Sequence, residues 1–176
     1  MKKNLLIWQI GGVTFTAVLG TLLHFLYQWT GVKFLATVSA VNESTWEHMK
    51  LVFIPSFIFS IIQSFFAKKD YGCFWVVKLI GILLGTLSIP VLFYTLSGTF
   101  GELSAISNIA IFFISIFIEY LVELVLINKI YCNVILKWVC ISVLLVILAL
   151  FIIFSFYPPK IPLFLDPVTS GYGIVS

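Results

Sequence analysis

The chain has 176 residues, of which 61% are hydrophobic and only 10% are charged, and its formal net charge is +3. The apolar share of a soluble globular domain is about 45–50%, and a mean hydropathy of +1.16 also departs in the apolar direction. The composition therefore excludes a soluble core and predicts an integral membrane protein, while so small a charge gives no support to nucleic-acid binding.

Five apolar stretches are long enough to cross a bilayer, for which about 20 residues of helix are needed. We expect spans over residues 5–27, 49–66, 74–96, 103–127 and 134–156, followed by a proline-rich tail over 157–176. The first stretch lacks a clear cleavage site, so it is interpreted as a retained helix. Because the connections are short, the fold class is an all-α membrane bundle with a single domain over residues 1–176.

The basic residues predict the orientation of this bundle, because cytoplasmic connections of membrane proteins carry an excess of lysine and arginine. All ten are lysines, and seven of them fall at the N-terminus or around the second and fourth connections: Lys2, Lys3, Lys68, Lys69, Lys78, Lys129 and Lys137. We therefore expect the N-terminus to be cytoplasmic and the C-terminal tail to be extracytoplasmic, in a bacterial cytoplasmic membrane. The cysteines Cys73, Cys132 and Cys140 are expected to be free thiols.

The connection before the second span contains an unusual concentration of ionisable residues. Residues 42–48 read Asn-Glu-Ser-Thr-Trp-Glu-His, between two long apolar runs. Charges beside a membrane span are costly, so they usually have a partner and a role. Ser44 followed by Glu47 also fits a capping box, in which the hydroxyl accepts from the Glu47 amide and the carboxylate returns to the cap amide. A helix is therefore expected to start here.

A polar pocket is expected at this end of the bundle. His24 lies about one turn below the end of the first span, at nearly the level of Glu43, Glu47 and His48. Imidazole nitrogens and carboxylate oxygens are standard ligands of zinc and similar cations, so His24, Glu47 and His48 are a candidate divalent-metal set. No metal signature such as HExxH is present. A small polar solute, a lipid head group or a purely structural cap are the alternatives, and Asp166 in the tail is expected to close over the mouth.

Small and polar residues at helical spacing predict which helix faces are buried, since membrane helices pack through such residues. The expected stripes are Thr14, Ala17, Thr21, His24 and Gln28 in the first span, Ser56, Ser60 and Gln63 in the second, Lys78, Gly81, Gly85, Ser88 and Thr95 in the third, and Ser104, Asn108, Ser115, Glu119 and Glu123 in the fourth. The fifth span has no such stripe and is expected to be the most lipid-exposed. Gly81 and Gly85 form a GxxxG motif that would serve either a homodimer or internal packing.

Two carboxylates one helical turn apart, Glu119 and Glu123, form with Lys78 an expected charge network inside the membrane. Two such groups cannot both stay ionised at low dielectric without a nearby cation, and Lys78 lies at the matching end of the preceding span. Three interpretations remain open at this point. The network is an ion pair plus a protonated glutamic acid that fix helix packing, or a proton or metal-ion relay, or Glu123 reaches the cytoplasmic interface by snorkelling.

Three segments resemble a known family. Residues 24–31 (His-Phe-Leu-Tyr-Gln-Trp-Thr-Gly), residues 41–51 around the acidic turn, and residues 157–167 with 171–174 in the tail are specific strings. They resemble a family of unknown function of small multi-spanning membrane proteins from Gram-positive bacteria, over the whole length. The resemblance implies a five-helix membrane protein whose distinctive residues gather on one side, and it implies no catalytic assignment.

Three functions follow as hypotheses. The leading one is a transport or transport-accessory protein whose outer-face pocket, formed by His24, Glu43, Glu47, His48 and Asp166, binds a cation, a small polar solute or a lipid head group. The second is a metal-dependent intramembrane hydrolase in which Glu43 or Glu47 activates water; with two histidines in the chain, a three-histidine site is excluded. The third is a structural or sensory subunit of a membrane complex. The lipid bilayer is the expected environment, and a membrane-protein partner or a homodimer is the expected partner.

Overall fold

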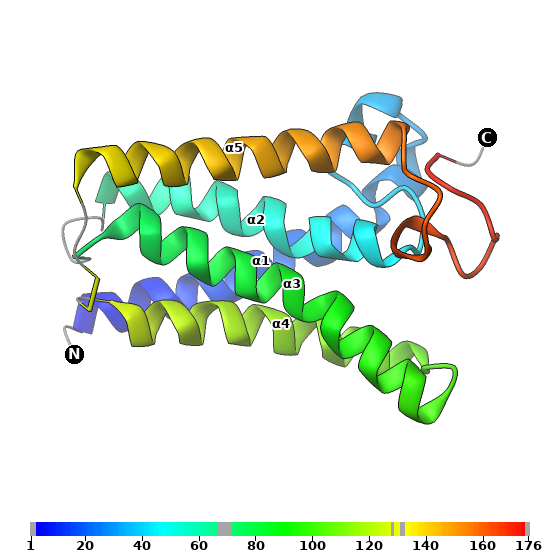
Figure 1. Ribbon diagram of the computed structural model, residues 1–176, viewed down its shortest axis with the longest axis horizontal. Helices are drawn as coiled ribbons and strands as arrows, with labels where there is room; N and C mark the ends of the chain where they lie inside the picture. The colour runs from blue at the N-terminus through cyan, green and yellow to red at the C-terminus, as the bar shows by residue number, and fades with distance from the viewer. Residues whose placement is uncertain (1–2, 67–71, 128, 131–132, 175–176) are drawn as a thin grey trace.

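The computed structural model describes residues 3–66, 72–127, 129–130 and 133–174, and over these residues the protein is helical without a β-strand. The five long helices are α1 (Lys3–Thr30), α2 (Thr45–Phe66), α3 (Phe74–Phe100), α4 (Ala105–Leu126) and α5 (Val134–Phe156), joined by the short 3-10 helices η1 (Lys33–Thr37) and η3 (Pro162–Phe164). They lie roughly along one axis (Figure 1). Each is long and apolar enough to span a bilayer, which points to a multi-pass membrane protein.

The helix bounds differ from the expected spans mainly at the end that carries the acidic turn. α1 and α3 continue beyond residues 27 and 96, and α2 begins at Thr45, before residue 49, whereas α5 has the expected range. The Glu47 amide donates to Ser44 Oγ at 3.4 Å, as a capping box requires. The predicted bond between the Ser44 amide and the Glu47 carboxylate is wrong, because the Ser44 amide donates to Asn42 Oδ1 at 2.9 Å. The Glu47 carboxylate is thus left for another partner.

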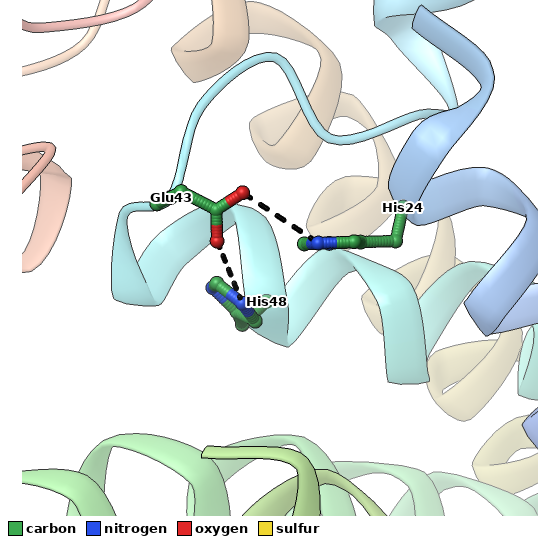
Figure 2. A group of neighbouring side chains, drawn as sticks. All are labelled: His24, Glu43 and His48. Carbon is green, nitrogen blue, oxygen red and sulfur yellow. Dashed lines mark ion pairs between the residues drawn. The ribbon is translucent and has the colours of Figure 1, made fainter. Parts of the chain in front are cut away.

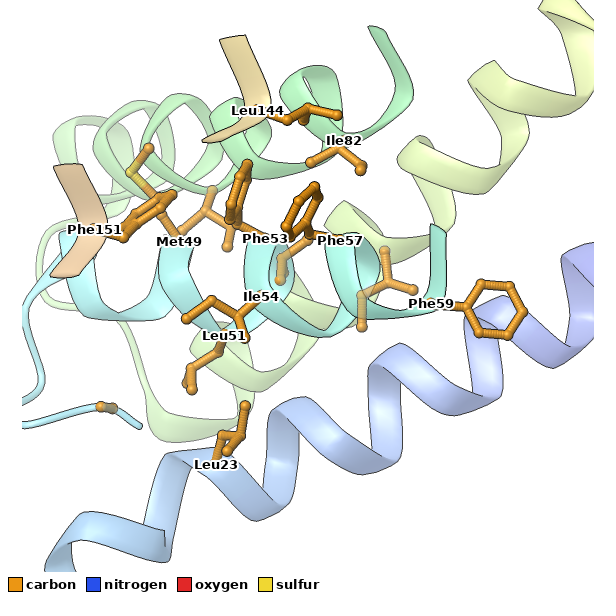
Figure 3. Close-up of a cluster of buried hydrophobic side chains, with 14 of the residues drawn as sticks. Leu23, Met49, Leu51, Phe53, Ile54, Phe57, Phe59, Ile82, Leu144 and Phe151 are labelled. Carbon is orange, nitrogen blue, oxygen red and sulfur yellow. The ribbon is translucent and has the colours of Figure 1, made fainter. Parts of the chain in front are cut away.

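Helix α2 forms the centre of the bundle. In its most apolar window 67% of the residues are buried, against 22% in α5, the lowest share of the five helices. The expectation that the last helix is the most exposed one is therefore confirmed. Aromatic side chains of α2 fill the core between the helices (Figure 3), and Phe53 packs against Phe151 of α5 with ring centroids 5.1 Å apart. Because the packing is dense, the position of α2 determines where the other helices lie.

The inward face of α1 is not the one expected from its polar residues. Thr14 and Thr21 are exposed, while Gln9 and Thr16 are buried. A β-carbon at Gly12 would lie 2.2 Å from the Tyr120 ring, so this glycine lets α4 approach. The glycines and buried polar groups of α1 therefore define its packing face. The threonines on the other side satisfy their hydroxyls locally, as Thr21 does by donating to the Ala17 carbonyl at 2.8 Å.

The GxxxG motif of α3 is used for packing inside the chain. A β-carbon at Gly81 would lie 2.5 Å from Glu123 Cγ, and one at Gly85 would lie 2.7 Å from Glu119 Cβ. Both glycines thus allow α3 to approach the carboxyl-bearing face of α4, as small residues do between membrane helices. This internal use accounts for the motif, and a homodimer stays a prediction.

The two ends of the bundle differ in what they carry. The loop between α1 and α2, the start of α2 and the C-terminal tail meet at one end, and the chain starts at the other (Figure 1). Lys2, Lys68, Lys69 and Cys132, which entered the predictions for this second end, lie outside the described residues.

Cys140 is a buried free thiol. Cys73 is disulfide-bonded, so the expectation of a free thiol is wrong for that residue.

Candidate functional site

The loop after α1 is folded back onto the last turns of that helix. Ser39 makes the main contact, because its hydroxyl donates to the Leu23 carbonyl and accepts from the Tyr27 amide at 2.8 Å. The Ala40 amide also donates to the Leu23 carbonyl at 3.2 Å. These bonds attach the loop to the backbone of Leu23 and Tyr27, which lie before and after His24 in the chain. They bring the acidic turn that follows next to the His24 ring.

Glu43 bridges two histidines that come from different helices. His24 of α1 has Nε2 at 3.5 Å from Glu43 Oε1, and His48 of α2 has Nε2 at 3.5 Å from Glu43 Oε2. Figure 2 shows the carboxylate between the two rings, whose centroids are 5.4 Å apart. Glu43 is about half exposed, at 48%, and both histidines are partly buried. One ligand atom from each of the three residues can be chosen so that all lie within 4.8 Å of one another.

The orientation of the His48 ring is fixed by its second nitrogen. His48 Nδ1 lies 2.9 Å from the Ser44 carbonyl oxygen. Because a carbonyl only accepts, Nδ1 carries the hydrogen, and the lone pair of the neutral ring is on Nε2. Histidines that bind metals usually hold their other N–H in this way, which fixes the tautomer and the ring direction. The nitrogen that faces Glu43 is therefore the one able to coordinate a cation.

The spacing of the three groups fits a small cation of the zinc type. Ligand atoms about 2.1 Å from a tetrahedral zinc ion lie about 3.4 Å from one another. The two imidazole–carboxylate separations are 3.5 Å, each to a different oxygen of Glu43, and one ligand atom from each residue can be chosen within 4.8 Å of the others. The side chains would therefore draw closer together to surround such an ion. Two histidines and one glutamate also form a ligand set that zinc sites use with the fourth position open to water or another ligand.

A pocket of 340 Å³ adjoins the cluster between α1, α2 and the start of α4. Its polar lining residues are Thr21, His24, Glu43, His48 and Asn108, and its other walls are mainly apolar. Asn108 Oδ1 is buried and makes no hydrogen bond in the described part of the protein. Since buried oxygens of this kind normally have a partner, Asn108 marks the pocket as a place for a donor or a cation.

Glu47 does not belong to this cluster, although it precedes His48 in the chain. Its Oε2 lies 2.6 Å from Lys50 Nζ, and its Oε1 accepts from Ser155 Oγ of α5 at 2.8 Å. Lys50 Nζ in turn donates to the Ala36 carbonyl of η1 at 3.0 Å, and the Val41 amide donates to Glu47. Glu47 and Lys50 thus clamp the loop, α2 and α5 together. Glu43, and not Glu47, is the carboxylate whose oxygens lie near both His24 and His48.

Asp166 also has a structural position. Its carboxylate is buried and accepts from the Val168 amide at 3.0 Å and from Thr169 Oγ1 at 2.6 Å, so it organises a turn within the tail. The neighbouring residues Pro167 and Val168 line a second, smaller pocket of 130 Å³ together with Glu43 and His48. The tail therefore lies beside the cluster, while the carboxylate of Asp166 points into its own turn.

The tail is held to the acidic turn by direct contacts. Asn42 Nδ2 donates to the Gly173 carbonyl at 2.9 Å. Trp46 packs against Phe151 and against Phe164 of η3, with ring centroids 4.5 and 4.7 Å apart. Residues 42–48 and the tail thus form one packed surface, in the arrangement that brings His24, Glu43 and His48 together.

The predicted charge network of Lys78, Glu119 and Glu123 lies between α3 and α4. It shares no residue with the cluster of two histidines and Glu43. Lys78 Nζ donates to Glu123 Oε2 at 2.6 Å, and Glu119 Oε2 accepts from Ser56 Oγ at 2.8 Å. Lys78, Glu119 and Glu123 are all 0% exposed. Glu123 therefore does not snorkel to an interface.

Three residues that hold the elements of the site together were not predicted from the sequence: Ser39, Lys50 and Ser155. Their side chains make the contacts between the loop and the helices but do not line the pockets. One signal was available for Lys50, because it follows Glu47 by three residues and such pairs meet on a helix surface. Ser39 and Ser155 give no comparable signal. A single serine in a loop or a helix becomes informative only when its distant partner is known.

Comparison with known proteins confirms that the chain belongs to a family of unknown function. The model of a family of unknown function (DUF6512) matches residues 1–174, so the chain belongs to this family. No curated protein and no solved structure matches the chain.

Proposed function

We propose that this member of a family of unknown function is a membrane protein that binds a divalent transition-metal ion, of the zinc type, at the His24–Glu43–His48 cluster. The bridging of two imidazoles by one carboxylate, at 3.5 Å on each side, is the observation that supports it most. Zinc is favoured over calcium or magnesium, because two of the three ligands are nitrogens and hard cations prefer oxygen.

The cation would reach the cluster through the adjoining pocket. Its walls include Asn108 Oδ1, which is without a hydrogen bond among the described residues, and the Glu43 carboxylate, which is half exposed. All these groups accept hydrogen bonds or coordinate cations, and no lysine lines either pocket. This polarity favours a cation over an anionic head group, and it supports a role in cation transport or in assisting a transporter.

The proposed side of the membrane is the extracytoplasmic one. Lys129 and Lys137 flank the opposite end of the bundle, where α1 also starts with Lys3, as the positive-inside rule requires of a cytoplasmic surface. The disulfide-bonded Cys73 directly precedes α3 at that same opposite end and favours the reverse orientation, because disulfides persist in oxidising compartments. A fluorescent protein fused after Ser176 distinguishes the two: it stays dark in cells if the tail is exported unfolded, and it fluoresces if the tail is cytoplasmic.

A second candidate function is metal-assisted hydrolysis, because two histidines and one glutamate are also the ligand set of hydrolytic zinc sites with an open position for water. Glu47 does not qualify as the base, since Lys50 and Ser155 occupy its oxygens. Cobalt substitution tests for the open position. A visible cobalt spectrum that changes on addition of azide or a hydroxamate supports it, and an unresponsive spectrum favours binding without hydrolysis.

Metal content is the direct test of the proposal. The full chain is purified in detergent with a tag that lacks histidine, loaded with zinc, dialysed and subjected to elemental analysis. We expect one zinc ion per chain in the parent and a loss of bound zinc in Glu43→Gln, His24→Ala and His48→Ala. Glu102→Gln is the matched control, because Glu102 is exposed and distant in sequence from the cluster. Equal zinc content in Glu43→Gln and the parent would refute the proposal.

A further inference from the structure

Three charged side chains lie between α3 and α4 with no exposed surface: Lys78, Glu119 and Glu123. If all three groups are ionised, the one ammonium and the two carboxylates together carry a net negative charge of one unit. An uncompensated charge inside a membrane-spanning bundle is costly, and such groups face partners or mark a pathway for ions or protons. The surplus charge therefore has to be removed by a further cation or by a proton.

Among the residues that the structure describes, the neighbours of this centre supply no second positive charge. α1 contributes the neutral Gln9 and Thr16, and α2 contributes Ser56. The Tyr120 hydroxyl of α4 lies 2.9 Å from Thr16 Oγ1. From α5, the buried described residues are Cys140, Leu144, Phe151 and Ser155, none of which carries a charge. Lys78 is thus the one cation that faces the two carboxyl groups among the described residues.

The two carboxyl groups are held unequally. Glu123 has the ammonium of Lys78 at 2.6 Å and a hydrogen bond from Gln9. Glu119 has one hydroxyl donor, Ser56, on its Oε2. The Oε1 atoms of both carboxyl groups are buried without a hydrogen-bond partner among the described residues, so the direct contact with the Lys78 ammonium is what distinguishes Glu123 from Glu119. The ionised form is therefore supported at Glu123. At Glu119 a proton removes the charge and supplies a donor for a group that otherwise only accepts.

Close packing keeps water away from Glu119. A β-carbon at Gly85 would lie 2.7 Å from Glu119 Cβ and 3.2 Å from its Oε2, so α3 covers the carboxyl directly. On the other side Ser56 Oγ lies 3.3 Å from Thr16 Oγ1, which continues to the Tyr120 hydroxyl. Each hydroxyl both donates and accepts, so the row can turn to suit a carboxylate or a carboxylic acid at Glu119.

From this arrangement we propose that Glu119 is a proton-binding site that holds and exchanges one proton inside the membrane-spanning bundle. The ligand is a proton, and its binding converts a carboxylate to a carboxylic acid without any other reactant. This site is separate from the metal cluster, so its outcome does not depend on zinc binding. It gives the protein a second, chemically different cation site.

Infrared spectroscopy of the full chain in lipid nanodiscs tests this directly, because a protonated carboxyl group has a carbonyl stretch that shifts in heavy water. We expect this band in the parent and in the control Glu102→Gln, and its loss in Glu119→Gln, which should fold because glutamine resembles the protonated acid. Ser56→Ala should shift the band, since Ser56 bonds Glu119 and not the Glu123–Lys78 pair. Raising the pH should diminish it.

Three outcomes would overturn the proposal. The first is a parent spectrum without any band that Glu119→Gln removes. The second is a band that Ser56→Ala leaves in place, which would assign the proton to Glu123. The third is a band that sodium chloride abolishes at constant pH, which would identify the ligand as sodium. Should Glu119→Gln fail to fold, the Ser56→Ala and pH measurements on the folded protein still decide.

Discussion

The His24–Glu43–His48 cluster and the charged centre between α3 and α4 both place ionisable side chains among apolar helices, but they hold them differently. In the cluster the partners are 3.5 Å apart and Glu43 is 48% exposed. In the centre Lys78 and Glu123 are 2.6 Å apart and fully buried. The more widely spaced groups of the cluster lie beside a pocket and leave room for a small cation. In the buried pair, each charge is already neutralised by its partner. Only the surplus carboxyl, Glu119, remains available there.

Breaking the buried pair should have the largest effect on stability. Lys78→Met leaves Glu123 ionised without its cation, and removing one partner of a buried pair costs about 3–5 kcal/mol. Equilibrium unfolding in mixed micelles measures this loss. The double variant Lys78→Met with Glu123→Gln should recover most of it, because the residual charge is gone. Additive losses in the double variant would show that the two side chains do not act as a pair.

The acidic turn itself provides the next comparison, between Glu43 and Glu47. Lys50→Met removes the cation from Glu47, which keeps the donors Ser155 and Val41, so we expect a loss near the lower end of the same range, about 3 kcal/mol. Glu43→Gln should change the free energy of unfolding by less than about 0.5 kcal/mol, since exposed ion pairs contribute little. Comparable losses in the two variants would remove the distinction between a structural and a binding glutamate.

Zinc should stabilise the protein only while the cluster is intact. A ligand that binds the folded chain alone, at 100 times its dissociation constant, adds about 2.7 kcal/mol. We expect this gain in the parent and in Glu102→Gln, and none in Glu43→Gln or His48→Ala. Unfolding curves with zinc and with a chelator measure it. A gain that persists in Glu43→Gln would place the bound zinc elsewhere in the chain.

A smaller effect is expected from the glycines that let α3 approach the charged centre. Gly85→Ala should cost about 1–2 kcal/mol, because its β-carbon meets the Glu119 side chain and the Ser115 carbonyl at 2.7 and 3.0 Å. Gly98→Ala is the matched control on the same helix, where nothing lies within 4 Å of the added carbon. It should be neutral or slightly stabilising. Equal effects of the two substitutions would show that close approach at Gly85 is unimportant.

Much of the fold could be predicted from the sequence, because the physical signal for a membrane helix is a long apolar run and needs no partner to be recognised. The same holds for residues that must find partners by charge, such as Lys78 opposite Glu119 and Glu123. The face of α1 was less predictable. Thr14 and Thr21 have the polar character expected of a packing face, but a threonine hydroxyl is also satisfied by its own helix, and Gln9 and Thr16 are the buried ones.

The candidate site was predictable in its residue types and only partly in its membership. From the sequence, Glu47 next to His48 is as suitable a ligand as Glu43, because both are carboxylates at one level of the bundle. What separates them is Lys50, together with Ser155 from a helix more than a hundred residues away in the chain. Such a long-range contact has no trace in local spacing. The side-chain direction of Asp166, turned into its own loop, was beyond prediction for the same reason.

X-ray absorption at the zinc edge of the loaded protein tests the central claim, metal binding by the cluster, most directly. We expect a first shell of nitrogen and oxygen at about 2.0–2.1 Å, with the outer scattering of two imidazole rings and a loss of that scattering in His24→Ala. A first shell with sulfur, or zinc without imidazole scattering, would contradict it.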